Sequence, residues 1–184
     1  GSGGTIRVAV TLNAAGTLRL GFGDATGYGT GADRIATINL VGGNMHVNTT
    51  SNQTLGSATI NMTGASITGV GGSNIDFFAG SSALNSLASA TSSTISGTQI
   101  KIRQAGGLTM TVADGAAATD LSISSVVAND GAYTTAPLIK AGAGTLQLTN
   151  AGNTYTGATT ISAGTFEVAG GGRLGSGAYA GTIS

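Results

Sequence analysis

The chain has 184 residues, of which 33 are Gly, one is Pro and none is Cys. Charged residues make up 8% of the chain, against about 25% in an average soluble domain, and seven Lys and Arg balance seven Asp and Glu. We expect no nucleic-acid partner, because such binding needs clustered basic residues, and no membrane insertion, because no apolar run approaches the ~20 residues of a spanning helix.

Short runs in which apolar and polar residues alternate follow one another along the chain. This period-two pattern is typical of half-buried β-strands, and the Gly pairs and Ser/Thr clusters between the runs are typical of tight turns. No helix is expected: 83–88 has a composition that allows one or two helical turns, but it is short and lacks a strong capping signal. In chain order, the expected strands are 5–10, 17–20, 38–40, 45–47, 60–62, 100–102, 108–112, 121–123, 146–148 and 166–168.

Near-identical five-residue segments recur at a regular separation along the sequence. ATINL at 36–40 returns as ATINM at 58–62, and GTLQL at 144–148 is answered by GTFEV at 164–168. A short repeat of this kind cannot bury its own apolar face and must stack on its neighbours, which predicts a β-solenoid. A sandwich or an ordinary barrel is disfavoured, because these strands are brief and aromatic residues amount to only 4%.

The repeat spacing also predicts a register. We expect an all-β, single-stranded parallel β-helix of roughly 20–22 residues per coil and about eight coils. The segments GTLQL and GTFEV, twenty residues apart, are expected to pair on adjacent coils, with Leu146 over Phe166 and Leu148 over Val168. Polar residues are expected on the outer face, where stacked Asn side chains can form ladders.

The most specific stretch is 138–168, which contains K-x-G-x-G-T-L-x-L, then N-x-Y-x-G-x-T-x-I, then G-T-F. It resembles the passenger-associated transport repeat, also called the autotransporter-associated β-strand repeat, and departs from that pattern at Phe166, where Leu is usual. Residues 36–135 resemble the family more weakly. The residues that carry the repeat pattern are Lys140, Gly142, Gly144, Thr145, Leu146, Leu148, Asn153, Tyr155, Gly157, Thr159, Ile161, Gly164, Phe166 and Val168.

The resemblance implies a right-handed parallel β-helix in the passenger of a Gram-negative autotransporter or a similar large surface protein. It implies a non-catalytic, structural role in passenger folding, export and display, with the chain secreted or held at the cell surface. We expect residues 1–4 to be a remnant of cloning. Residues 5–184 are expected to form one β-helical segment of a longer chain, whose neighbouring coils are its partners.

Two other functions remain open. The first is an adhesin or carbohydrate-binding module that contacts an extracellular glycan or a host surface through loops such as 21–34 or 71–98. Tyr28 and Tyr133 lie in Gly-rich loops and are the candidates for such contact, whereas Tyr155 belongs to the repeat pattern and is expected to pack at a corner of the coil. The second, disfavoured by the sparse charge, is a polysaccharide-degrading enzyme.

The ionisable residues predict no catalytic, cofactor or metal site. His46 is the only histidine; it alternates with Met45 and Val47 and should face outward. Asp114 and Asp120 form the best carboxylate pair for glycoside hydrolysis, but Asp114 precedes Gly115 and is typical of a turn.

Overall fold

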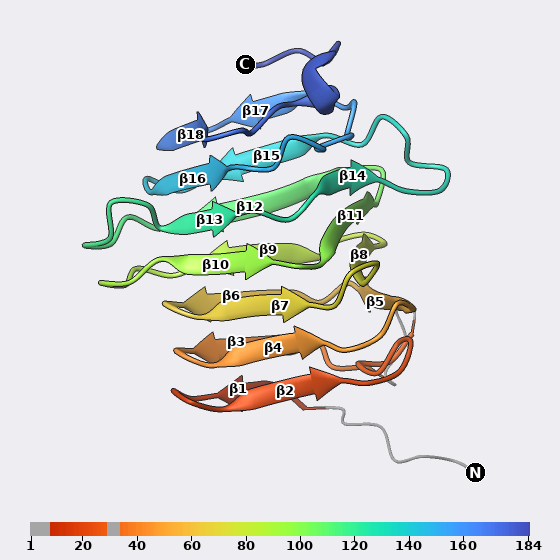
Figure 1. Ribbon diagram of the computed structural model, residues 1–184, viewed down its shortest axis with the longest axis vertical. Helices are drawn as coiled ribbons and strands as arrows, with labels where there is room; N and C mark the ends of the chain where they lie inside the picture. The colour runs from red at the N-terminus through yellow and green to blue at the C-terminus, as the bar shows by residue number, and fades with distance from the viewer. Residues whose placement is uncertain (1–7, 29–33) are drawn as a thin grey trace.

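Short strands that alternate between buried and exposed positions build this protein, which we describe from a computed structural model over residues 8–28 and 34–184. Every strand pairing in these ranges is parallel. The strands of Figure 1 that face the viewer run to the right and those behind run to the left, while the chain rises from its N-terminus at the bottom. The fold is therefore a right-handed parallel β-helix, as predicted.

Within residues 8–28 and 34–184, the strands form three sheets along the helix axis. Sheet A has seven strands, in the order β1 (Val10–Leu12), β3 (Thr37–Val41), β6 (Thr59–Thr63), β9 (Ala83–Ser86), β12 (Leu108–Val112), β15 (Leu138–Ala141) and β17 (Thr159–Ile161). Sheet B also has seven, in the order β2 (Thr17–Leu20), β4 (Asn44–Val47), β7 (Ser66–Gly69), β10 (Ser93–Ser96), β13 (Leu121–Ile123), β16 (Thr145–Leu148) and β18 (Thr165–Val168). Sheet C has four, in the order β5 (Asn52–Gly56), β8 (Asn74–Phe78), β11 (Gln99–Arg103) and β14 (Val127–Asn129). A 3₁₀ turn, η1 (Gly175–Gly177), follows the last strand.

The solenoid has about 6 turns, fewer than the eight expected. The reason is that coil length varies. Ile38 pairs with Ile60, 22 residues on, whereas Leu108 pairs with Leu138, 30 residues on. The extra residues lie in corners such as 113–120, between β12 and β13, which protrude without adding a strand.

Stacked aliphatic side chains fill the interior. Ile38, Ile60, Leu84 and Met110 pair in succession across β3, β6, β9 and β12, and each is fully buried. Burying such a side chain contributes about 1.5–3 kcal/mol. Residues 83–86 form a strand, because Leu84 belongs to this column and pairs with Ile60 on the preceding coil.

A ladder of amides runs along the outer face of sheet A. Asn85 Nδ2 donates to Asn61 Oδ1 at 2.9 Å, and Asn61 Nδ2 donates to Asn39 Oδ1 at 2.8 Å. The predicted Asn ladder is therefore present on three successive coils. Among the described residues, no helix is long and apolar enough to cross a membrane.

Candidate functional site

The side chain of Lys140 points into the core. Lys140 pairs with Met110 of β12 on one side and with Ile161 of β17 on the other, and it is fully buried. Its Nζ donates to the carbonyl oxygens of Ala141 at 3.0 Å, Gly142 at 2.7 Å and Ala163 at 3.0 Å. All three donors of the ammonium group are thus used, and they join two successive coils at one corner.

Burial lowers the pKa of Lys140, and the charge of Asp120 opposes that shift. The sequence interpretation placed Lys140 in the repeat pattern without predicting that it is inside. The signal was present, because Lys140 lies two residues after Leu138 and so shares its face of the strand.

The corner that holds the ammonium group depends on glycine. Gly142 and Gly164 occupy equivalent turns on adjacent coils, with φ of 80° and 70°. A Cβ on Gly142 would collide with the carbonyl oxygen of Val112, on the coil before. Only glycine combines this left-handed backbone with such a close approach.

Asn153 links three coils at the corner between sheets B and C. Its side chain is fully buried. The Oδ1 atom accepts from the backbone N–H of Val127 at 2.9 Å, on the preceding coil. The Nδ2 atom donates to the carbonyl of Asn150 at 2.7 Å and to that of Arg173 at 2.9 Å, on the following coil.

Tyr155 continues this pattern of links. Its ring belongs to the hydrophobic core, and burial raises its pKa well above the usual tyrosine value. Its hydroxyl lies 2.8 Å from Oγ1 of the buried Thr159, which lies 2.8 Å from the hydroxyl of Tyr179. Tyr179 in turn donates to the carbonyl of Gly157 at 2.6 Å. This row of hydroxyl contacts therefore links two successive coils.

Lys140, Gly142, Asn153, Tyr155 and Gly164 fall within one segment that is similar to a known family. Residues 138–168 match the passenger-associated-transport-repeat. The match confirms the resemblance seen in the sequence and stops short of residues 36–135, where the weaker likeness was noted. Neither a search of curated proteins nor a search of solved structures found a match to the chain.

The strands of the passenger-associated-transport-repeat have the predicted register. Leu146 pairs with Phe166 and Leu148 pairs with Val168. Leu146 and Leu148 are fully buried, whereas Val168, on the last strand of sheet B, is 42% exposed. Thr145 begins β16, and its backbone N–H donates to Oδ2 of Asp120 at 2.8 Å.

The two candidate contact tyrosines do not form a common platform. Tyr28 is 62% exposed, and its ring stacks on that of Phe78 in β8 at 6.4 Å between centroids. Tyr133 is half-buried, packs against the core and follows β14. Because β11 lies between β8 and β14 in sheet C, these rings belong to different coils.

Asp114 and Asp120 do not form a catalytic pair. Asp114 is exposed, whereas Asp120 is buried and uses both oxygens on backbone donors, accepting from Gly115 N at 2.8 Å through Oδ1. His46 is half-buried, and its Nδ1 lies 2.9 Å from Thr68 Oγ1 on the next coil. In the part of the chain that the structure describes, no group of three or more His, Cys, Asp or Glu side chains could hold a metal ion.

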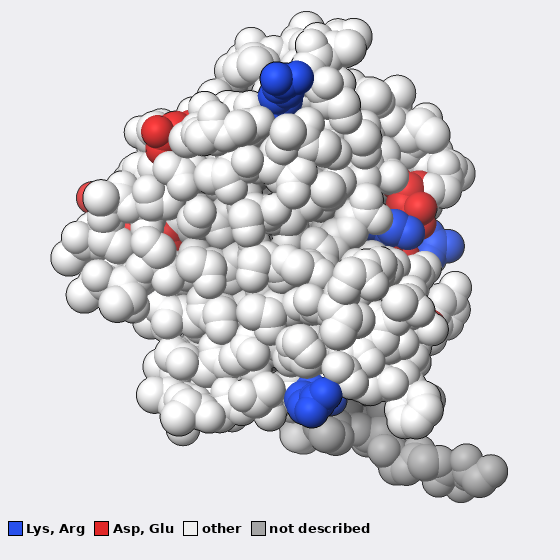
Figure 2. Space-filling model, viewed as in Figure 1, with Lys and Arg blue, Asp and Glu red and all other residues white. Residues whose placement is uncertain are grey.

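The sequence interpretation missed a charged ladder on the outer face of sheet C. Asp76 of β8 is fully buried and lies 3.6 Å from Nη1 of Arg103 in β11. Lys101 of β11 lies 3.5 Å from Asp130, which follows β14. Figure 2 shows acidic and basic side chains meeting at the right-hand edge, where Figure 1 places sheet C, while most of the near face is uncharged.

Burial dominates the electrostatics of this ladder. It raises the pKa of Asp76 to about 6; Lys101 and Arg103 act in the opposite direction, and Asp130 and Asp24 reinforce the rise. Asn52 Nδ2 donates to Oδ2 of Asp76 at 3.0 Å. The ladder was not visible in the sequence, because Asp76 and Lys101 become neighbours only once a coil length of 25 residues, from 76 to 101, is known.

Proposed function

We propose that this chain is a structural β-helical segment of an exported bacterial passenger protein, acting without catalysis in passenger folding and surface display. The observation that carries the proposal is the repeat at 138–168, whose buried polar side chains join successive coils. Its family and the solenoid fold both fit such a segment.

The repeat suits coil-by-coil folding of a chain that emerges from the cell. Lys140 and Asn153 each reserve a donor for the coil that follows, at Ala163 and at Arg173. Until that coil docks, one N–H donor of each side chain lacks its protein acceptor, which is unfavourable once the side chain is buried. Docking of the next coil therefore completes the hydrogen bonds of buried side chains on the previous coil. This coupling favours folding of the coils one after another along the axis.

On this proposal, the partners of the segment are the neighbouring coils of the parent protein, and its site of action is outside a Gram-negative cell. An adhesin role toward an extracellular glycan remains the alternative. The sparse charge and the weakly charged near face fit a passive stalk that avoids strong electrostatic partners.

A display experiment tests the structural role. The whole chain is placed between a secretion signal and an autotransporter barrel in a Gram-negative host, and surface exposure is measured by protease accessibility of intact cells. Lys140→Met together with Asn153→Ala should lower display severalfold. The matched control, Lys101→Met with Asn150→Ala, changes the same residue types at less buried positions and should leave display near the wild-type level.

Equal display by the repeat variant and its control would contradict a folding role for the repeat. If both variants lost display equally, general instability of the solenoid would be the cause. Only a selective loss in the first variant supports the proposal.

A further inference from the structure

Three tripeptides of the form N-x-T lie close together, beginning at Asn48, Asn52 and Asn61, and none has Pro in the middle. This sequence is the acceptor for attachment of a sugar to the asparagine side chain, which requires an asparagine at the surface. Attachment to a folded chain also requires that an enzyme can reach the asparagine and the hydroxyl residue from outside. The solenoid places the three tripeptides in different surroundings, and only the first of them meets these requirements.

The tripeptides at Asn52 and Asn61 lie within strands. Asn52 begins β5, its Nδ2 donates to Oδ2 of Asp76 at 3.0 Å, and Thr54, the hydroxyl residue of this tripeptide, is buried. Asn61 lies in β6, where its Nδ2 and Oδ1 are both used in the amide ladder of sheet A. A sugar on either nitrogen would have to fit between side chains of neighbouring coils. The fold therefore disfavours modification at both positions.

The tripeptide at Asn48 begins in the corner between β4 and β5, outside both strands. Asn48 and Thr50 are both exposed. The backbone N–H of Asn48 donates to the carbonyl of Leu20 on the preceding coil at 2.8 Å, which fixes the place of Asn48 in the solenoid. Its side chain makes no hydrogen bond to any residue that the structure describes. The side-chain amide is therefore accessible at a position that the backbone holds.

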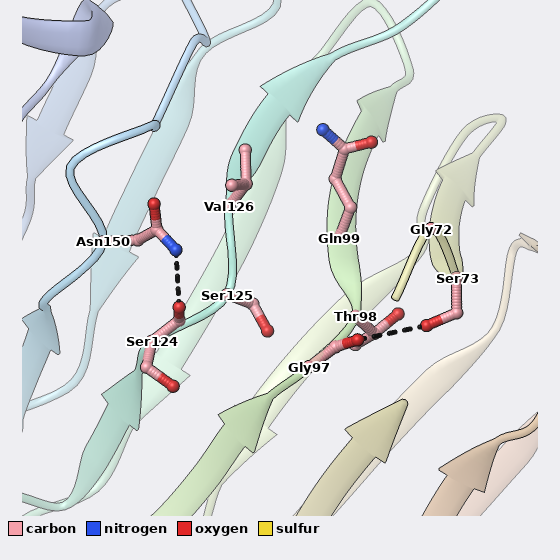
Figure 3. A pocket seen from close by; sticks show the side chains of 9 residues that line it. All are labelled: Gly72, Ser73, Gly97, Thr98, Gln99, Ser124, Ser125, Val126 and Asn150. Carbon is pink, nitrogen blue, oxygen red and sulfur yellow. Dashed lines mark hydrogen bonds between the residues drawn. The ribbon is translucent and has the colours of Figure 1, made fainter. Parts of the chain in front are cut away.

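Other corners along the same edge use their side chains to hold coils together. In Figure 3, Ser73 Oγ donates to the carbonyl of Gly97 at 3.3 Å. In the same view, Asn150 Nδ2 donates to the carbonyl of Ser124 at 2.7 Å. Asn150 also follows a strand of sheet B, but its amide joins two coils, and no Ser or Thr stands two residues after it. Attachment of a sugar to Asn48 breaks no such contact.

The hydroxyl residue of the tripeptide at Asn48 can be reached as well. The Cγ2 methyl of Thr50 lies toward the next coil, where a Cβ on Gly72 would be 3.5 Å from it. The corner is also held locally, because the N–H of Ser51 donates to Oγ1 of Thr49 at 3.2 Å. A transferase can therefore contact this corner without separating two coils.

A sugar at this corner has a physical use. The chain carries no net charge and few charged residues, and the near face in Figure 2 is mostly uncharged. Copies of such a chain repel one another only weakly, which favours association. An attached sugar is bulky and solubilising, so it opposes close contact between copies.

We propose that Asn48 is an attachment site for a sugar, which a glycosyltransferase of the producing cell transfers from a nucleoside diphosphate sugar. The Nδ2 atom of Asn48 forms a bond to the anomeric carbon of the sugar, and the bond from that carbon to the diphosphate oxygen breaks. The nucleoside diphosphate leaves, and the proton released from Nδ2 passes to a base of the transferase. This modification goes beyond the structural role and is independent of it.

Mass spectrometry of the protein isolated from the bacterium that produces it is the direct test. The peptide that contains Asn48 should carry the added mass of a sugar, and the Asn48→Gln variant made in the same cells should lack it. An unmodified Asn48 in the isolated protein would overturn the proposal.

A reconstituted reaction tests whether the fold selects Asn48. The folded chain is incubated with uridine diphosphate glucose and a soluble bacterial N-glycosyltransferase that accepts N-x-T, and a synthetic peptide of residues 43–64 is the unfolded control. The folded chain should gain glucose at Asn48 alone, whereas the peptide should gain it at all three asparagines. A folded chain that stays unmodified, or that reacts at Asn52 or Asn61 as fast as at Asn48, would contradict the proposal.

Variants of the tripeptide separate the acceptor sequence from exposure alone. Thr50→Ala should abolish the reconstituted reaction, and Thr50→Ser should preserve it. Thr49→Ala is the matched control, because the middle position accepts any residue except Pro, and it should react as the wild type does. Equal loss in Thr49→Ala and Thr50→Ala would contradict the role of the tripeptide. The melting temperature should not fall when glucose is attached, and a fall would show that the Asn48 side chain does hold the corner.

Discussion

Lys140 pairs directly with Met110 on the preceding coil, so an ammonium group continues a column of buried aliphatic side chains. The charge is tolerated because three carbonyl oxygens replace the water that it loses. In this column, apolar side-chain packing therefore gives way to hydrogen bonds from Lys140 near the start of the passenger-associated-transport-repeat.

Lys140→Met tests this linkage. Methionine keeps most of the volume and fits the column, but it leaves the carbonyls of Ala141, Gly142 and Ala163 without their donor. We expect the free energy of unfolding to fall by about 1–3 kcal/mol, measured by urea denaturation. Lys101→Met, at a half-buried ion pair, should cost less than about 1 kcal/mol. Equal stability of Lys140→Met and the wild type would show that the hydrocarbon stem alone matters.

Asn153→Ala should be among the most damaging polar substitutions in the repeat. It removes one acceptor and two donors at a buried position and leaves the N–H of Val127 unpaired. We expect a loss of about 2–4 kcal/mol in the free energy of unfolding. Asn150→Ala, a half-buried neighbour, serves as the control and should cost about 1 kcal/mol. A smaller loss for Asn153→Ala than for Asn150→Ala would refute the linking role.

Gly142→Ala combines two penalties. Alanine at a φ of 80° is strained, and its Cβ would meet the carbonyl of Val112. A left-handed backbone alone costs about 1–2 kcal/mol, so with the collision we expect more than ~2 kcal/mol. Gly171→Ala is the matched control, because a Cβ there meets nothing within 4 Å. Thermal unfolding of both variants measures the difference, and equal melting temperatures would contradict the prediction.

The sequence predicted sheets A and B better than sheet C. Segments such as TINL and TLQL alternate strictly between apolar and polar residues. The spacing of twenty residues between GTLQL and GTFEV predicted the observed pairing of Leu146 with Phe166. Strands β5 and β8 read NQTLG and NIDFF, and both are buried on both faces, so their alternation is hidden. Residues 5–7 of the first expected strand lie outside the described residues, and β1 begins at Val10.

Site chemistry was harder to predict for a related reason. Within one coil, Leu138 indicates that Lys140 faces inward. Between coils, a neighbour is known only when every corner length is known, and here these lengths vary. The contact of Asp76 with Arg103 depends on those lengths.

Asp76 predicts a pH dependence with a definite sign. Its folded-state pKa is raised from 3.8 to about 6, so the folded state binds the proton more tightly than the unfolded state does. Stability therefore falls as the pH rises from about 4 to about 6, by about 3 kcal/mol at most, since one pKa unit corresponds to about 1.36 kcal/mol. Asp76→Asn removes this dependence and can keep the hydrogen bond from Asn52.

Urea denaturation at intervals between pH 4 and pH 7 measures the effect as the difference in the free energy of unfolding between variant and wild type. Asp76→Asn should gain stability relative to the wild type as the pH rises through this window. Asp114→Asn, at an exposed turn, controls for the loss of one negative charge. Parallel curves for Asp76→Asn and the wild type would mean that Asp76 stays ionised throughout, with Lys101 and Arg103 outweighing its burial.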